Sequence, residues 1–448
     1  MGMSKSMQRF VLSVVFVVFL LGSMAESVTA SEKMDRKVRA DRSKFLKHGF
    51  WLYNDIDQAY RQAKKSGKPI LVSFRCVPCT ECVKIDEAVI ESDARLAFLF
   101  PQFVCVRVVG TNGLDLNTFQ FDTDQSFSMF MLNADKTIYG RYGTRSDRTE
   151  WKDDVSVDGL VEALEGALEL HKNYPANREL FAGKTRDPWE FRTPERYPYI
   201  KKPNRLDYAG KVSKSCIHCH EVGEARRDFY REKSKPVPAR LMYPYPHPKS
   251  IGLILDPKTR ATVKRVISTS PAARAGLKKG DRIEFLGGQP LLSMADVQWV
   301  LHYVPFEGAE LPMKVRRGTA EKSLSLKLSK GWRERGDTSW RVSTWIFRRA
   351  LGGMKLDALS ASARKKLGIR GEMALQVVYL GDWQSFGIAR KQGLKKGDVI
   401  VEFDGRSDFP RESDVIDHVN IRRKAGDVVG VVLLRNGKTL RKKLPLQR

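Results

Sequence analysis

The chain has 448 residues, which is more than one ordinary domain holds, so about two to four domains are expected. Its 42% of hydrophobic residues is enough to bury cores, and this excludes a disordered polymer. The formal net charge of +27 favours acidic partners, including an anionic membrane surface at the periphery, but no nucleic-acid-binding signature accompanies it.

The first 30 residues carry the pattern of a secretory signal peptide. Lys5 and Arg9 precede an apolar run over residues 10–21, and a small-x-small site ends at Ala30. The apolar run is shorter than the roughly 20 residues that a membrane span needs, and an uncleaved anchor is the alternative. We therefore expect an exported protein of the periplasm or cell envelope, where disulfides persist.

Residues 31–172 alternate between helix and strand patterns. Asn54 stands where it would cap a helix over 55–65, and Gly67 stands where that helix would end. Short apolar runs between turn residues predict four strands and a closing helix. The predicted strands cover 68–74, 103–108, 128–132 and 137–139, and the helix covers 157–170. Strands covered by helices in this order predict an α/β fold.

The stretch AKKSGKPILVSFRCVPC, residues 63–79, places a Cys-x-x-Cys pair directly after the first of these strands. It resembles the start of exported thioredoxin-like domains, with a match over roughly residues 45–172. The resemblance implies that Cys76 is the attacking thiolate and Cys79 the resolving thiol. The chain departs from the family pattern at Arg75, where an aromatic residue is common, and at Phe127, where a cis-proline is expected.

Thiolate chemistry at Cys76 also has a physical basis, because free N–H groups at a helix start and the Arg75 charge both stabilise a thiolate. Cys82 shares a helix face with Cys79, which makes it a candidate second resolving thiol or metal ligand. The alternative is a static Cys76–Cys79 disulfide, with Cys82 and Cys105 as ordinary buried cysteines. Assignment as a thiol-disulfide oxidoreductase therefore stays open.

Residues 173–249 are rich in Pro, Arg, Lys and Tyr, which predicts an extended connector that wraps other surfaces. In its middle, CIHCH at residues 216–220 is the signature of covalent haem attachment. Cys216 and Cys219 would form thioethers with the porphyrin, and His220 would bind the iron from below. The stretch also resembles segments of c-type cytochromes, which implies one covalent haem c.

Two rival interpretations of this motif remain: a structural Cys216–Cys219 disulfide, and a zinc site. Zinc prefers four ligands, and no second Cys-x-x-Cys follows nearby to complete such a set. If haem is bound, Met242 and His247 are the candidates for the distal ligand. A methionine there would raise the reduction potential relative to a second histidine.

The C-terminal part repeats one module. SPAARAGLKKGDRIEFLGG begins at Ser270 and ARKQGLKKGDVIVEFDG begins at Ala389, and the matching residues Asp281 and Asp398 are 117 positions apart (398 − 281). The copies resemble bacterial PDZ domains over 250–330 and 345–448. The resemblance implies that each binds an extended peptide at a glycine loop. The loop residues would be Ile251, Gly252 and Leu253 in the first copy, and Leu351, Gly352, Gly353 and Met354 in the second.

These patterns predict a multidomain protein: an α/β thioredoxin-like domain over 31–172, a haem-binding connector over 173–249, and two strand-rich α+β PDZ-like domains. The favoured function is extracytoplasmic redox work on a redox partner protein, near proteins whose C-termini the PDZ-like domains bind. The alternative is a non-catalytic peptide-binding adaptor with structural disulfides. A protease is excluded, because the chain has no Gly-x-Ser-x-Gly motif and no room for a hydrolase core.

Overall fold

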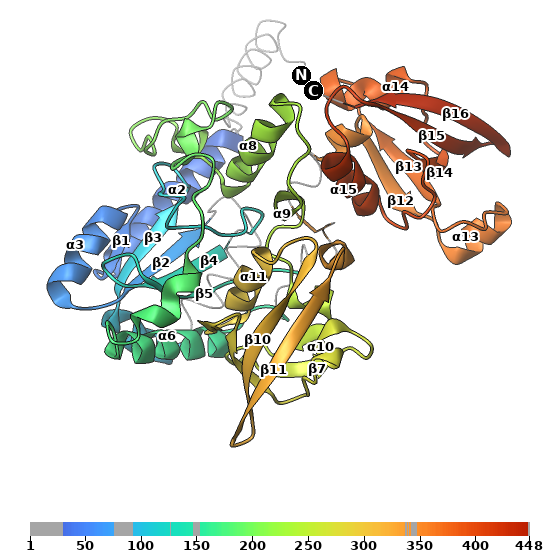
Figure 1. The fold of residues 1–448 in the computed structure, drawn as a ribbon. Coiled ribbons are helices and arrows are strands. Elements are labelled where there is room, and N and C mark those ends of the chain that lie inside the picture. Colours follow the sequence, from blue (N-terminus) through green and yellow to red (C-terminus); the bar gives the residue numbers. More distant parts are fainter. Residues whose placement is uncertain are drawn as a thin grey trace, which may run out of the picture.

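The computed structural model describes residues 30–75, 93–125, 127–146, 153–336, 338, 340–341 and 347–446. The predicted signal peptide and the thiols of Cys76, Cys79 and Cys82 lie outside these residues. The described chain forms an N-terminal domain (30–172), a connector (173–249), a first repeat (250–330) and a second repeat (347–446) (Figure 1). No helix within these ranges is long and apolar enough to cross a bilayer.

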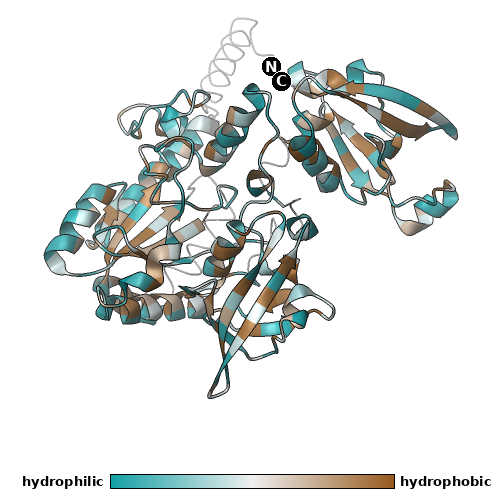
Figure 2. Cartoon of the chain, viewed as in Figure 1, coloured by the Kyte–Doolittle hydropathy of each residue, from teal (hydrophilic) through white to brown (hydrophobic). Residues whose placement is uncertain are grey.

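A mixed five-stranded sheet organises the N-terminal domain, with strand order β1-β3-β2-β4-β5. Its strands are β1 (Trp51–Tyr53), β2 (Ile70–Arg75), β3 (Val104–Val109), β4 (Phe127–Leu132) and β5 (Ile138–Tyr142). The first three run parallel, and β4 and β5 are antiparallel to their neighbours. Every residue of β2 to β5 is buried, and Figure 2 shows hydrophobic residues along this sheet. The helices are α2 (Ala30–Lys47), α3 (Ile56–Ser66), α5 (Ala94–Leu99) and α6 (Val157–Lys172).

The predicted cap of α3 was wrong by one residue. Asp55 caps the helix, and its side chain accepts a hydrogen bond from the Gln58 N–H at 2.8 Å. Asn54 instead adopts a left-handed φ of 54° and accepts a hydrogen bond from the Val109 N–H at the end of β3. Gly67 ends the helix in the left-handed conformation, as predicted.

The connector is more structured than its composition predicts. It contains the 14-residue helix α8 (Cys219–Glu232) and several short turns of helix. These short elements are η2 (Arg178–Lys184), η3 (Pro194–Arg196), α7 (Val212–Ser215), α9 (Ala239–Met242) and η4 (Pro248–Ile251). Its buried apolar side chains, such as Trp189 and Ile217, share a core with Phe74 and Val106 of the sheet. The connector thus completes the N-terminal domain's core, because aromatic residues compensate for the scarcity of aliphatic ones.

The two repeats use the same internal contacts, as the sequence offset predicts. In the first, Asp281 accepts from the Lys278 N–H and pairs with Arg317; in the second, Asp398 does the same with Lys395 and Arg435. The first repeat contains β6 (Leu253–Leu255), β7 (Val263–Val266), α10 (Pro271–Arg274), β8 (Arg282–Leu286), β9 (Gln289–Pro290), α11 (Met294–His302), β10 (Gly308–Arg317) and β11 (Ala320–Ser329). The second contains η6 (Arg348–Leu351), β12 (Met354–Ala358), α13 (Ala361–Lys366), β13 (Leu375–Leu380), α14 (Ile388–Lys391), β14 (Val399–Phe403), α15 (Glu412–Arg422), β15 (Val428–Arg435) and β16 (Lys438–Pro445).

The first repeat packs closely against the N-terminal domain through glycines. A Cβ atom on Gly159 of α6 would lie 2.1 Å from the Pro257 carbonyl oxygen, and one on Gly166 would lie 2.7 Å from Leu292. Real Cβ atoms do not approach this closely, so a side chain at either position would separate the two surfaces. The two parts therefore behave as one packed unit.

A buried ion pair crosses the same interface. The Lys184 ammonium lies 2.7 Å from the Asp296 carboxylate, and both side chains are 0% exposed. Burial lowers the pKa of Lys184, against the opposing effect of the Asp296 charge. The indole of Trp299 donates to the Gly183 carbonyl at 2.9 Å. Since an unpaired charge is costly at such a site, these contacts fix the orientation of α11 on the connector, which completes the core of the N-terminal domain.

Candidate functional site

The carboxyl ends of β2 and β3 lie side by side at one edge of the N-terminal sheet. Arg75 ends β2 and pairs with Val109, which ends β3. In the sequence Cys76 follows Arg75 directly, outside the described residues, and Gly110 follows Val109. β2 and β3 therefore end at the same edge of the sheet, and the predicted dithiol follows the end of β2 in the sequence.

The second cysteine motif is attached to the same edge by backbone hydrogen bonds. Thr111 donates its N–H to the Ile217 carbonyl at 2.8 Å, and the Ile217 N–H donates to the Asn112 side chain at 2.9 Å. The Asn112 amide also donates to the carbonyls of Ser215 and Pro203. Because Asn112 lies three residues past the end of β3, these bonds hold residues 215–217 at that strand's end.

Cys216 packs against Gly110, the residue that follows the end of β3. Its side chain is 4% exposed, and a Cβ atom on Gly110 would lie 2.8 Å from its Sγ. Gly110 has a φ of 80°, which favours glycine in any case. Cys219 is half-buried and is the first residue of α8. Close packing at Gly110 thus defines the position of the Cys216 sulfur.

Charged and aromatic groups surround the motif. Lys202 donates to the Cys216 carbonyl and to the Glu221 carboxylate, each at 2.7 Å. The rings of His218 and His220 stack with centroids 5.6 Å apart. Burial lowers the pKa of His218, while the Glu221 charge opposes that shift. His218 is therefore mostly neutral at physiological pH.

The residue types of the motif fit a covalent haem. α8 begins at Cys219, so the two thiols flank a turn and His220 lies in the first turn of the helix. His220 and Cys219 are partly exposed, whereas Cys216 is buried. Within the described residues, no three His, Cys, Asp or Glu side chains are grouped to hold a metal ion.

The two candidate distal ligands lie in other environments. Met242 is fully buried in the hydrophobic core of the second repeat. His247 Nε2 lies 3.3 Å from the carboxylate of Asp154. Burial lowers the pKa of His247, opposed by its bond to Asp154. Each side chain is thus engaged in a contact that distal coordination would have to break.

The helix that begins at the motif ends against the second repeat. The Arg227 guanidinium lies 4.5 Å from the Phe347 ring centroid. Asp228 pairs with Arg349 of η6 at 2.6 Å, and Arg231 donates to the Asn420 side chain at 3.0 Å. Figure 1 shows α8 between the N-terminal domain and the second repeat. One rigid helix therefore links the cysteine motif to the glycine loop of the second repeat.

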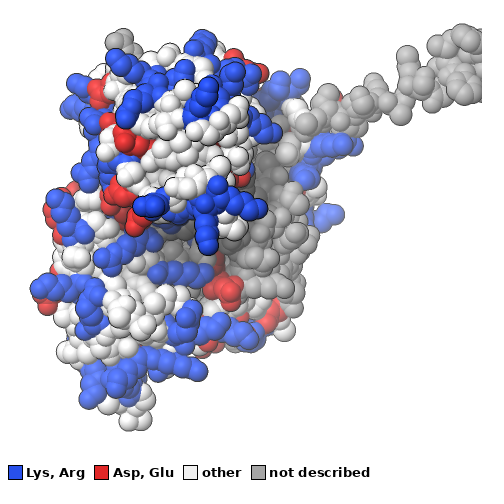
Figure 3. Space-filling model, turned by 90° about the vertical axis from the view of Figure 1, so that its right-hand side faces the viewer, with Lys and Arg blue, Asp and Glu red and all other residues white. Residues whose placement is uncertain are grey.

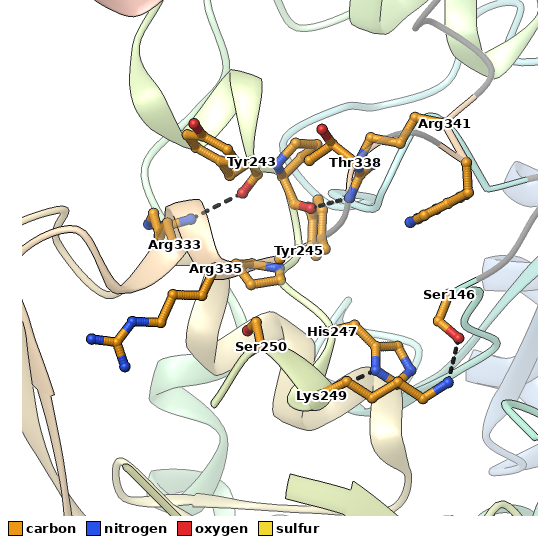
Figure 4. A pocket seen from close by; sticks show the side chains of 14 residues that line it. Ser146, Tyr243, Tyr245, His247, Lys249, Ser250, Arg333, Arg335, Thr338 and Arg341 are labelled. Carbon is orange, nitrogen blue, oxygen red and sulfur yellow. Dashed lines mark hydrogen bonds between the residues drawn. The ribbon is translucent and has the colours of Figure 1, made fainter. Parts of the chain in front are cut away.

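The predicted loop of the first repeat is a tight turn with buried sides. Ile251 and Leu253 are 0% and 2% exposed, and Gly252 has a φ of 75°. A pocket of about 240 Å³ lies beside it (Figure 4). There Lys249 donates to Ser146 of the N-terminal domain at 2.6 Å, and His247 lies next to it. The pocket therefore lies at the junction of the first repeat and the N-terminal domain.

The predicted loop of the second repeat depends on its two glycines. Gly352 and Gly353 have φ values of 62° and 86°. A Cβ atom on Gly353 would lie 1.8 Å from the Phe386 carbonyl oxygen. Leu351 and Met354 on either side are fully buried. The N–H groups of the two glycines donate to the carbonyls of Arg349 and Arg348, and their own carbonyls accept from Ala389 and Gly381. The backbone of the loop is therefore held by hydrogen bonds within the repeat.

Sequence reasoning missed the residues that hold these parts together. Asn112, Lys202 and Lys184 each bond to groups far along the chain, so no local pattern marks them. The only sequence signal was a weak one: a Thr-Asn-Gly turn directly after a predicted strand.

Comparison with known families supports two kinds of domain. The thioredoxin-like family model matches residues 51–134. The PDZ domain model matches twice, over residues 242–328 and 366–446. The first match covers the sheet of the N-terminal domain up to β4, and the other two cover most of the repeats.

Similar curated proteins are bacterial. Two are probable periplasmic serine endoproteases, DegP-like, from Pseudomonas savastanoi pv. phaseolicola and Ectopseudomonas mendocina, 28% and 30% identical over 156 residues. Each match covers 34% of this chain and 31% of the relative, so the chain spans about a third of their length.

Among solved structures, the HtrA-type protease AlgW with decapeptide and with tripeptide is 18% and 20% identical. The TM-scores are 0.19 and 0.18, over 30% of this chain and 41% and 42% of those chains. On the family-model matches, the chain contains a thioredoxin-like domain followed by two PDZ domains.

Proposed function

We propose that this chain is an exported redox protein whose two cysteine motifs work at one edge of the thioredoxin-like sheet. The observation that carries the proposal is the attachment of the Cys216 motif, by Thr111 and Asn112, to the end of β3. That strand ends beside Arg75, the residue that precedes Cys76. A fold that brings a distant Cys-x-x-Cys to this edge favours redox chemistry over two unrelated structural disulfides.

The thiol reaction needs the dithiol form of Cys76 and Cys79. The Cys76 thiolate attacks one sulfur of a partner's disulfide, forms a mixed disulfide and releases the partner's first thiolate. Cys79 then attacks Cys76, forms the Cys76–Cys79 disulfide and releases the second thiolate. Two electrons pass to the partner, and the reverse sequence oxidises a dithiol.

The second motif would hold one haem c, with Cys216 and Cys219 as thioether residues and His220 as the iron ligand. A bound haem supplies one-electron transfer. Lys202 and Glu221 hold the turn around Cys216, and His218, mostly neutral, adds no charge beside the iron ligand. A dithiol exchanges two electrons and a single haem one, so the two centres act independently unless another acceptor joins them.

A second candidate is a non-catalytic adaptor. The tight packing of the first repeat on the N-terminal domain favours it, because a scaffold needs rigid relative positions. In this candidate both cysteine pairs are structural disulfides and the second repeat binds a protein's C-terminus. The export of the DegP-like relatives, named periplasmic, agrees with either candidate.

The test is a pyridine haemochrome spectrum and an intact mass of exported full-length protein, made with a haem-attachment system. The wild type should be coloured and heavier by one haem, and Cys216→Ala/Cys219→Ala should be colourless. His218→Ala is the matched control and should keep the haem. A colourless wild type with a closed Cys216–Cys219 disulfide would favour the adaptor.

A further inference from the structure

The second repeat carries an unusual contact on its free strand edge. β12 is the outer strand of its sheet, with β13 on one side only. The Leu356 N–H in this strand donates to the Glu412 carboxylate at 2.8 Å. Glu412 is the first residue of α15, across from the strand edge. The Glu412 side chain thus accepts the hydrogen bond of the Leu356 N–H, on the strand edge where a PDZ domain adds a peptide strand.

An arginine next to the glycine loop holds this carboxylate in place. Both oxygens of Glu412 pair with Arg348, at 2.9 Å to Nε and 2.9 Å to Nη2. Arg348 begins η6, which leads directly into Gly352 and Gly353. The Arg348 and Glu412 side chains are 22% and 12% exposed, so water reaches the pair only partly. A two-point arginine–carboxylate pair of this kind is geometrically specific.

The first repeat has no such contact. Its corresponding helix, α11, begins with Met294, which has no charged group. That helix is buried along its whole length and packs on the N-terminal domain. The Glu412 carboxylate therefore belongs to the second repeat, which packs on α8 and α9 and not on the sheet of the N-terminal domain.

We propose that Glu412 is a latch that closes the peptide edge of the second repeat, and that an extended peptide with a carboxylate opens it. This inference rests on the peptide-binding part of the proposed function. A peptide strand on β12 needs the Leu356 N–H, so the Glu412 carboxylate must leave. The Arg348 guanidinium would then be partly buried and unpaired, which is costly unless a carboxylate of the peptide replaces that of Glu412.

Charge complementarity identifies the occupant as an anionic peptide rather than a neutral one. Besides Arg348, the loop region carries Arg390, Arg349, which pairs with Asp228, and Lys355, which lies 3.8 Å from Asp357. On the face drawn in Figure 3, Lys and Arg side chains are more widespread than Asp and Glu side chains. A C-terminal carboxylate at the glycine loop, or an acidic side chain beside it, would replace Glu412 on Arg348. A peptide without either group would leave this arginine unpaired.

The experiment uses full-length protein and a phage-displayed library of random decapeptides with free C-termini. The probe is the peptide selected on Glu412→Ala, made with a free and with an amidated C-terminus. Glu412→Ala should bind the free form about 10-fold more tightly than wild type, and Glu412→Gln should lie between them. Arg348→Gln in the Glu412→Ala background should remove the preference for the free carboxylate. Glu372→Ala, an exposed acidic residue of the same repeat, is the matched control and should bind like wild type.

Hydrogen exchange of the Leu356 amide gives a readout that needs no peptide. The Leu356 amide should exchange slowly in wild type and in Glu372→Ala, and it should exchange faster in Glu412→Ala. Equal affinity of wild type and Glu412→Ala, unchanged exchange of Leu356, or no selected peptide on either protein would overturn the proposal. Thiol titres and the haem spectrum do not depend on Glu412, so failure of the latch is distinguishable from failure of the redox function.

Discussion

Asn112 accepts a hydrogen bond from the Ile217 N–H across 105 positions of sequence. Together with Thr111, this side chain ties the second cysteine motif to the end of β3, next to the strand that leads to Cys76. The chemistry proposed for the chain depends on that connection, and so do the first two predictions.

Replacing Asn112 should loosen the cysteine motif. Asn112→Ala removes one acceptor and the donor to Ser215 and Pro203, and should lower the free energy of unfolding by about 1–3 kcal/mol. In protein expressed without haem attachment and kept reduced, iodoacetamide should label Cys216 faster. Asn112→Asp keeps the acceptor for Ile217 and should show a smaller effect on labelling. Equal labelling rates in all three proteins would show that the contact does not position the motif.

Gly110 should be intolerant of a methyl group for two separate reasons. Gly110→Ala places a Cβ atom 2.8 Å from the Cys216 Sγ and strains a φ of 80°. Gly67 has a φ of 71° with nothing within 4 Å of the added atom, so Gly67→Ala measures the backbone strain alone. Gly110→Ala should cost about 1–3 kcal/mol more than Gly67→Ala in chemical denaturation. Equal losses of unfolding free energy in the two variants would mean that Cys216 moves away from the added methyl group without cost.

The buried ion pair should control how the first repeat docks. Lys184→Met leaves Asp296 charged and unpaired, and should lower stability by about 3–5 kcal/mol. Differential scanning calorimetry should then resolve a separate transition for the first repeat. The control is Lys258→Met, which removes a largely exposed lysine pairing with Asp158 at 4.0 Å. An unchanged single transition for Lys184→Met would contradict the view that the two parts form one packed unit.

Asp154 should make stability sensitive to acid. Burial raises its pKa, but the hydrogen bond and charge of His247, with Lys249, outweigh this and lower the pKa from 3.8 to about 2. The folded state therefore favours the carboxylate, and the gain is present above pH 4 and lost as pH falls through 2. Asp154→Asn should cost about 2 kcal/mol at pH 6, with the difference from wild type vanishing near pH 2 in urea titrations. A difference independent of pH would show that the folded state does not stabilise the charged form of Asp154.

Local sequence patterns predicted the helices and strands of the fold, but they did not predict contacts between residues that are far apart in the sequence. The strands β2, β3 and β4 follow from apolar runs, and the equivalence of Asp281 and Asp398 follows from their spacing of 117 residues (398 − 281). Asn54 was expected as the cap of α3, but its side chain bonds to Val109 on a neighbouring strand. Such contacts depend on which strands become neighbours, which no single segment of sequence reveals.

The candidate site was predicted in its residue types but not in its surroundings. The spacing of Cys216, Cys219 and His220 predicts haem attachment, and this stays a prediction. The packing of Cys216 on Gly110 and the reach of α8 to the second repeat could not be predicted, because proline- and arginine-rich sequence gives little periodicity. The same composition concealed a complete helix, which the aromatic side chains of the connector stabilise.

The central claim is that this edge of the sheet carries redox chemistry, and a redox titration tests it most directly. Exported protein would be equilibrated in thiol-disulfide buffers of known potential and trapped with iodoacetamide, and the states of Cys76 and Cys79 counted by mass spectrometry. We predict that the Cys76–Cys79 disulfide opens around −270 mV. A disulfide that stays closed well below about −300 mV would contradict the account.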